Sequence, residues 1–150
     1  MPCTIKTVSW RFSDIALAYP ELQQQKIYIR SPQDVYSNFL FLFKQQVKER
    51  FIAFWLNSAN RVTGFEVITE GLLNSSLVHP REVFRGAIVA TCASIICAHN
   101  HPSGNTEPSA EDLAITKQIA EAGKIIGIPV HDHIIFTDDA YTSFAERGLI

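Results

Sequence analysis

The sequence predicts an α/β domain in which a mixed sheet is covered by helices on both faces. Segments with helical periodicity alternate with apolar runs of strand length, in the order helix, strand, strand, helix, strand, helix, strand. Two of these runs, Phe51–Leu56 and Ala93–Ala98, are almost wholly apolar, which is typical of strands buried on both faces. Strands of this kind form one sheet with helices packed on either side. A chain of 150 residues is long enough to bury one such core.

Each predicted helix has a start signal. Residues 31–34 place a capping serine before a proline and an acid three residues after the cap, so a helix is expected over 32–48. A second begins at 80–82, and a third opens at Ser109 and stops near Gly127. The side chains expected to face inward are Val35, Phe39, Leu42, Phe43 and Val47, then Val83, Phe84, Ala87, Ile88 and Thr91, then Leu113, Ile115, Ile119 and Ala120.

The remaining elements are strands and turns. Turn residues at 57–60 link the first apolar run to a strand over 62–69, which makes a hairpin, and a last strand region covers 128–136 before a closing segment at 143–148. Residues 1–30 are interpreted as an N-terminal arm or as edge strands, because Val8–Phe12 alternates and Lys26–Ile29 is short and apolar. Residues 31–150 then form the folded domain.

Composition excludes several classes of protein. A formal charge of −2 excludes a generally basic nucleic-acid binder, and no apolar run reaches the roughly 18 residues of a membrane span. Cys3, Cys92 and Cys97 are odd in number and form no C-x-x-C pair, so they are interpreted as free thiols in a reducing compartment. We therefore expect a cytoplasmic protein that does not enter a membrane.

His99, His101 and Asp112 are the predicted ligands of one metal ion. The two histidines follow an apolar strand at positions i and i+2, so both side chains leave an extended chain on the same side. Asp112 comes from the start of the next helix, which the loop after His101 can bring over the same point. Imidazole nitrogen and carboxylate oxygen are zinc ligands, and a catalytic zinc site has three protein ligands and one open position.

Each of these residues also has a purely structural interpretation. Two histidines in one loop are often solvated, and Ser109-x-x-Asp112 matches a capping box that needs no metal. Cys97 could face the same side as His99, but with three ligands present it is interpreted as a core residue. A hydrolase also needs a carboxylate that moves the proton of the water. The candidates are Glu49, Glu66, Glu70, Glu82, Glu107 and Glu111, and composition alone does not choose among them.

The motifs resemble those of a known family. His99-x-His101 followed by Ser109-x-x-Asp112 resembles the JAMM motif of MPN/JAB-domain metallopeptidases. The segments 99–104, 132–135 and 143–148 resemble the RadC-type branch, and the resemblance covers about residues 30–150. It implies an MPN core, a three-layer α/β/α arrangement similar to that of cytidine deaminases.

The resemblance also implies roles for individual residues. His99, His101 and Asp112 would hold zinc, Glu49 would be the catalytic glutamate that precedes the first buried strand, and Ser109 would support the water or the oxyanion. Asp132 and His133 also match the family, either as supports of the zinc ligands or as a buried polar pair that closes the sheet.

Two functions of different classes follow. The first is a zinc-dependent hydrolase that cleaves a peptide or isopeptide bond of a peptide or protein substrate. The second is a metal-stabilised, non-catalytic binding module associated with DNA repair or mobile elements. Longer RadC relatives carry an N-terminal helix-hairpin-helix region for which this chain has no room, so direct nucleic-acid binding is not expected. A zinc nucleobase deaminase is excluded, because the sequence has neither H-x-E nor P-C-x-x-C. The substrate and the oligomeric state stay open.

Overall fold

A mixed five-stranded sheet, in the order β2-β1-β3-β4-β5, forms the centre of the protein. The computed structural model describes residues 5–13, 19–22, 26–71 and 77–150. Its strands are β1 Glu49–Leu56, β2 Val62–Gly71, β3 Ser94–Asn100, β4 Val130–Phe136 and β5 Tyr141–Ser143. Its helices are α1 Pro32–Phe39, α2 Pro80–Val89 and α3 Ala110–Ile126, with short 3-10 turns η1 Pro20–Leu22 and η2 Leu40–Leu42. In the described part of the chain, no helix has the length and apolar character needed to cross a membrane.

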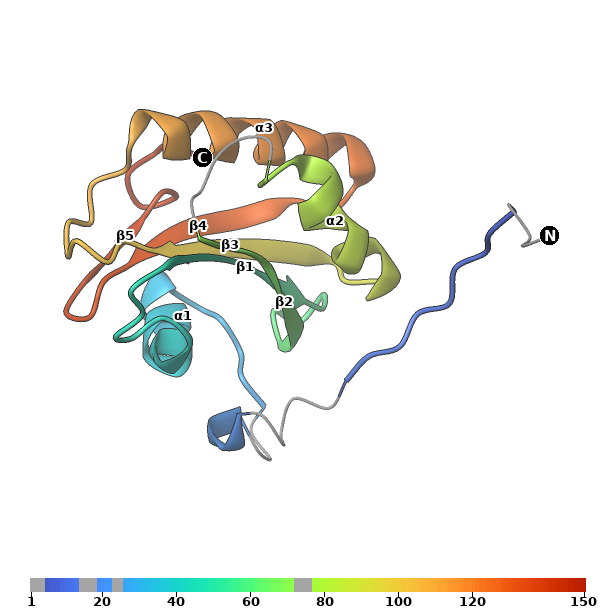
Figure 1. Cartoon of the computed structure of the whole chain (residues 1–150), viewed down its shortest axis with the longest axis horizontal. Coiled ribbons are helices and arrows are strands. Elements are labelled where there is room, and N and C mark those ends of the chain that lie inside the picture. The colour runs from blue at the N-terminus through green and yellow to red at the C-terminus, as the bar shows by residue number, and fades with distance from the viewer. Residues whose placement is uncertain (1–4, 14–18, 23–25, 72–76) are drawn as a thin grey trace.

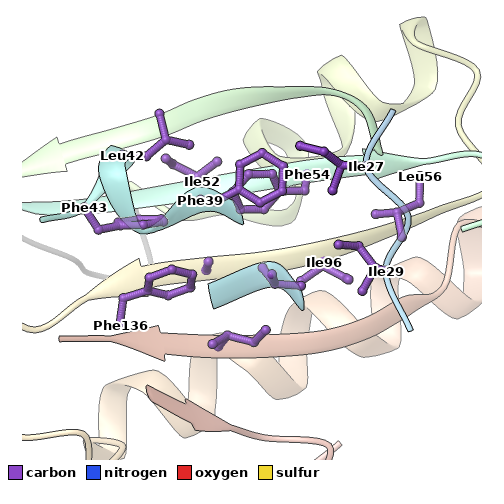
Figure 2. Close-up of a cluster of buried hydrophobic side chains, with 13 residues drawn as sticks. Ile27, Ile29, Phe39, Leu42, Phe43, Ile52, Phe54, Leu56, Ile96 and Phe136 are labelled. Carbon is purple, nitrogen blue, oxygen red and sulfur yellow. The ribbon is translucent and has the colours of Figure 1, made fainter. Parts of the chain in front are cut away.

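Helices cover both faces of the sheet, which confirms the predicted layers (Figure 1). On the α1 face, a cluster of aromatic and aliphatic side chains lies between the helix and the strands, with the rings of Phe39 and Phe54 4.4 Å apart (Figure 2). On the other face, α2 and α3 pack on the sheet through a second cluster that includes Phe84, Ile119 and Cys97. The burial of both faces explains why β1 and β3 are almost wholly apolar.

Strand directions bring three chain segments to one edge of the sheet. β3 and β4 are parallel and connected through α3, whereas β1 is antiparallel to β3. The start of β1 therefore lies beside the ends of β3 and β4, and Phe51 pairs with His99. The carboxyl ends of parallel strands are where sites form in open α/β sheets.

The first helix is shorter than predicted. α1 ends at Phe39, and Val47, expected to face inward, is 88% exposed. Gln45 adopts a left-handed φ of 58°, and its N–H donates to Asp138 Oδ1 at 3.0 Å. The chain uses residues 43–48 to turn toward β1, so the apolar spacing there does not continue the helix.

Three other inward assignments are wrong, and the first is Thr91, which is exposed and follows the end of α2 at Val89. Ile88 is 53% exposed and Leu113 is 41% exposed. The buried stripe of α3 comprises Asp112, Ile115, Thr116, Ile119 and Gly123. Since successive residues of a helix point about 100° apart, a stripe through Asp112 turns Leu113 outward.

The predicted edge strand at Val8–Phe12 is absent. These residues are described without strand pairing, and Val8, Trp10 and Phe12 are exposed. An alternating run becomes a strand only when it pairs with a neighbour. Near Lys26–Ile29 the pairing is a single bridge between Tyr28 and Arg61. Residues 1–4, 14–18, 23–25 and 72–76 lie outside the described chain, and the division at residue 30 stays a prediction.

Candidate metal centre

The two histidines are placed by the end of β3. This strand runs through His99 to Asn100, two residues further than predicted, and His101 is the first residue after it. The His101 N–H donates to Phe136 O at 2.9 Å, so the backbone stays aligned with β4. Both imidazoles therefore leave the strand on the side of α3, as the i, i+2 spacing predicted.

A tight turn then leads the chain to α3. The Gly104 N–H donates to His101 O at 3.0 Å, and Gly104 has a φ of +83°, which a side chain would disfavour. Ser109 caps the helix, and Asp112 lies in its first turn, buried and directed at the histidines. The loop thus brings the helix start over the strand end.

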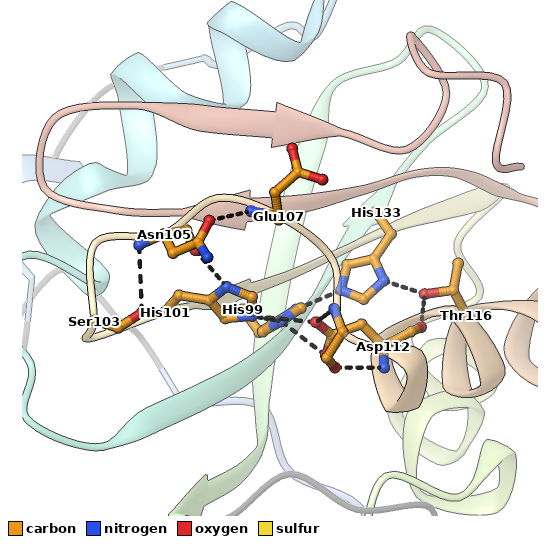
Figure 3. A network of polar contacts seen from close by, with 9 residues as sticks. His99, His101, Ser103, Asn105, Glu107, Asp112, Thr116 and His133 are labelled. Atoms are coloured by element: carbon orange, nitrogen blue, oxygen red, sulfur yellow. Dashed lines mark hydrogen bonds and ion pairs between the residues drawn. The ribbon is translucent and has the colours of Figure 1, made fainter.

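His99, His101 and Asp112 meet at one point (Figure 3). The Nε2 atoms of the two histidines are 3.0 Å apart. Asp112 Oδ1 lies 3.2 Å from His99 Nε2, and Asp112 Oδ2 lies 3.2 Å from His101 Nε2. His99 is fully buried and His101 is partly buried. The three side chains present ligand atoms that can hold one metal ion.

Asp112 also completes the predicted capping box. The Asp112 N–H donates to Ser109 Oγ at 3.0 Å, and the Ser109 N–H donates to Asp112 Oδ2 at 2.8 Å. The carboxylate therefore caps α3 and faces both histidines at once. The structural interpretation and the metal interpretation of Asp112 are compatible.

Charge coupling within the group is strong. Burial alone would raise the pKa of Asp112, but hydrogen bonds with His101 and His99 and the Ser109 N–H hold that pKa well below its usual range. The hydrogen bond with Asp112 raises the pKa of His101, against the effect of burial. The carboxylate is thus ionised at neutral pH and attracts a cation, either a proton on His101 or a metal ion.

A second layer of contacts lies behind His99. Its Nδ1 is 2.7 Å from His133 Nε2, and His133 Nδ1 contacts the hydroxyl of Thr116. The Thr116 hydroxyl donates to Asp112 O at 2.7 Å. Burial, together with the nearby His99, holds the pKa of His133 well below its usual range, so His133 is neutral. On the second histidine of the group, His101 Nδ1 lies 2.7 Å from Asn105 O.

Asp132 and His133 have different surroundings. Asp132 accepts hydrogen bonds from Ser143 Oγ at 2.6 Å and from the Ala145 N–H at 2.9 Å, which tie β4 to the closing segment. His133, in contrast, contacts the predicted ligand His99. Cys97 is buried in the core cluster on the α2 and α3 face, as predicted, and burial raises the pKa of its thiol.

Glu49 begins β1 on the same edge of the sheet. It lies two residues before Phe51, the partner of His99, so its side chain leaves β1 on the face that carries His99. Its carboxylate contributes to the raised pKa of His101. Asn100 holds the backbone on either side of it: Asn100 Oδ1 accepts from the Arg50 N–H at 2.7 Å, and Asn100 Nδ2 donates to Lys48 O at 3.0 Å.

Four of the other candidate glutamates face arginines. Glu66 and Glu82 both contact Arg85, at 3.5 and 3.3 Å. Glu70 lies 3.1 Å from Arg50, and Glu107 lies 3.2 Å from Arg147. These ion pairs give those four carboxylates structural partners.

Sequence reasoning missed Thr116 and the role of Asn100. Thr116 lies one helical turn after Asp112, so the i, i+4 spacing could have placed both on the buried face of α3. The side-chain amide of Asn100 in β3 bonds the backbone at the start of β1, and no local pattern in the sequence indicates that contact.

Comparison with known proteins agrees with the resemblance in the motifs. Residues 29–149 match the family described as RadC-like JAB domain. A UPF0758 protein of Methanosarcina mazei is 43% identical over 129 residues, which cover 86% of this chain and 56% of that protein. A UPF0758 protein of Salinibacter ruber is 48% identical over 128 residues, which cover 85% of this chain and 55% of that protein. The chain thus spans about half the length of these relatives.

Proposed function

We propose that this chain, which belongs to the RadC-like JAB domain family, is a zinc-dependent hydrolase of peptide or isopeptide bonds. The observation that carries the proposal is the meeting of two imidazole nitrogens and one carboxylate, 3.0 to 3.2 Å apart, at the carboxyl end of β3. The family includes many hydrolases, which supports the same conclusion.

The donor set fits zinc. Two atoms about 2.0–2.1 Å from one tetrahedral zinc ion lie about 3.3 Å apart, close to the separations found here. Two histidines and one aspartate leave a fourth position for water or substrate. His99, His101 and Asp112 would hold the ion, and zinc bound there would polarise a carbonyl and lower the pKa of its water to about 7.

Glu49 is proposed as the general base. It lies at the edge of the sheet that carries the ligands, and its charge acts on His101. Its carboxylate takes a proton from the attacking water and returns it to the leaving amine. The backbone contacts with Asn100 hold the start of β1 in place for that role.

Ser109 is proposed to stabilise the oxyanion. Its Oγ accepts the Asp112 N–H at 3.0 Å, and its own proton is therefore available to donate. The residue is exposed and adjoins the metal group through its hydrogen bonds with Asp112, so a substrate carbonyl bound there could reach it. A positioned donor of this kind stabilises negative charge that develops during the reaction.

Glu49→Gln tests the assignment of the base. The zinc-loaded protein is assayed on quenched-fluorescent peptides of mixed sequence and on lysine isopeptide conjugates. Glu49→Gln is expected to keep one zinc per chain and to lose at least about 100-fold in rate, the lower range for general-base catalysis. The matched control is Glu70→Gln on the neighbouring strand, which breaks a surface ion pair and should keep the rate. Full activity of Glu49→Gln would show that another group is the base.

The alternative function is a metal-stabilised binding module without turnover. One observation favours it: Asp112 caps α3 as well as facing the histidines, so the metal group is joined to a structural element. In that case removal of zinc lowers the melting temperature, and the wild-type protein cleaves none of the probes. Hydrolysis that requires both zinc and Glu49 would exclude this alternative.

A further inference from the structure

The hydroxyl of Thr116 determines which ring nitrogen of His133 carries the proton. The Thr116 side chain is buried on α3, and its single O–H donates to Asp112 O at 2.7 Å. The hydroxyl oxygen can then only accept at its contact with His133 Nδ1. His133 therefore carries its proton on Nδ1.

The tautomer of His133 in turn determines which ring nitrogen of His99 carries a proton. His133 is 1% exposed, and its two ring nitrogens contact a hydroxyl and another imidazole, so a charge on it would be buried without a carboxylate partner. A neutral imidazole has one donor and one acceptor nitrogen. With its proton on Nδ1, His133 accepts at Nε2 from His99 Nδ1–H, 2.7 Å away.

The ring of His133 cannot easily turn to reverse these roles. It stacks on Phe144 with ring centroids 4.6 Å apart and meets the edge of Phe51 at 5.3 Å. Both phenylalanines are fully buried. Packing against these two rings thus holds the imidazole of His133 between Thr116 and His99, where Figure 3 shows it.

We propose that Thr116 and His133 are positioning residues that keep the proton of His99 on Nδ1 and leave its Nε2 lone pair free for the metal. This inference rests on the proposed zinc site and adds two residues, from α3 and β4, to it. His101 needs no such support, because a backbone carbonyl, Asn105 O, accepts from its Nδ1. His99 is the ligand whose tautomer depends on side chains.

Thr116→Val and Thr116→Ser form the matched test. Valine has the same shape but leaves His133 Nδ1–H without an acceptor, which favours the other tautomer of His133. That tautomer donates from Nε2 to His99 Nδ1, and the proton of His99 must then move to Nε2, where it blocks the metal. We expect Thr116→Val to lower zinc affinity about 10–100-fold, the range for loss of a partner behind a metal ligand. Thr116→Ser keeps the hydroxyl and should stay within about threefold of wild type.

Two readouts separate this role from simple packing. Zinc affinity is measured by competition with a chromophoric chelator, and long-range 1H–15N spectra of the metal-free protein show which nitrogen of His99 carries the proton. Wild type and Thr116→Ser should show a proton on His99 Nδ1, and Thr116→Val should lose that proton. If Thr116→Val fails to fold, His133→Gln and His133→Leu replace it, since only glutamine offers His99 an acceptor and should restore affinity.

The outcomes distinguish the two proposals. Weak zinc binding by the wild type overturns the zinc site. The position of the proton on metal-free His99 still tests whether Thr116 and His133 position that ring. Strong zinc binding that is equal in wild type and Thr116→Val overturns only the positioning role of Thr116 and His133. A metal-free wild type in which His99 carries no proton on Nδ1 also overturns it, whereas a second proton on Nε2, which faces the Asp112 carboxylate at 3.2 Å, does not.

Discussion

Asn100 hydrogen-bonds the peptide groups on both sides of Glu49. Its Oδ1 accepts from the Arg50 N–H at 2.7 Å, and its Nδ2 donates to Lys48 O at 3.0 Å. Asn100 lies between His99 and His101 in the sequence. Because successive side chains of a strand point to opposite faces, its side chain leaves on the side opposite to theirs. The end of β3 therefore presents His99 and His101 on one side, and the Asn100 side chain between them holds the start of β1.

Asn100→Ala should lower stability and activity while zinc content stays unchanged. The substitution removes two part-buried hydrogen bonds, each worth about 0.5–1.5 kcal/mol, so the free energy of unfolding should fall by about 1–3 kcal/mol. Glu49 loses its fixed backbone, and the hydrolysis rate should fall as well. Urea denaturation, peptide cleavage and elemental analysis measure the three quantities. The control Asn38→Ala removes only a local bond to Asp34 O within α1; if it had the same effect on the rate, the link to Glu49 would be wrong.

Substitutions at Asp112 and Ser109 should separate capping from metal binding. Asp112→Asn keeps an oxygen that accepts the Ser109 N–H, but it loses the charge that faces His99 and His101, so zinc should be lost while the helix stays capped. Ser109→Ala removes the acceptor of the Asp112 N–H, so stability should fall by about 1 kcal/mol with zinc retained. Elemental analysis and thermal melting measure both effects. Retention of one zinc per chain by Asp112→Asn would remove Asp112 from the ligand set.

Stabilisation by zinc should weaken at low pH, because His101 must lose its proton to bind the metal. In the metal-free protein the pKa of His101 is raised by Asp112. A raised pKa in the folded state stabilises the fold fully below the ordinary value of about 6.5, and this contribution is lost as the pH rises through the raised pKa. Zinc needs the unprotonated ring, so protons compete with it.

The rise in melting temperature on adding zinc should therefore shrink as the pH falls through the pKa of His101. Melting curves with and without zinc from pH 5 to pH 8 measure it. In His101→Ala the proton-linked part should vanish together with the zinc effect. A zinc-induced rise that is constant over this range would contradict the proposed competition.

The layers and the meeting of His99, His101 and Asp112 were predictable because they depend on local patterns. The apolar runs of β1 and β3 and the Ser109 cap are visible in consecutive residues, and the i, i+2 spacing of His99 and His101 fixes their common side. The buried stripe of α3 was misplaced because Asp112 and Thr116 are polar residues on an inward face. Hydrophobic periodicity counts such positions as outward.

The contacts behind the site were not predictable, because they join distant segments. His133 reaches His99 only because β3 and β4 are parallel neighbours. Asn100 reaches Lys48 only through the antiparallel pairing of β3 with β1. Strand order and register decide these contacts. Glu49 illustrates the same limit: family resemblance pointed to it, and its choice over the other glutamates stays a proposal.

Cys97 should not contribute to metal binding, although it leaves β3 on the same face as His99. Its side chain packs in the apolar cluster on the α2 and α3 face, and burial raises the pKa of its thiol, so the thiolate that binds zinc is disfavoured. Cys97→Ala should therefore keep one zinc per chain and lose only the stability of a small buried side chain, whereas His99→Ala should lose the metal. Cys97→Ser should be less stable than Cys97→Ala, because a buried hydroxyl without a partner costs about 1–3 kcal/mol. Elemental analysis and urea denaturation of the three variants test this, and loss of zinc from Cys97→Ala would place a sulfur ligand in the site.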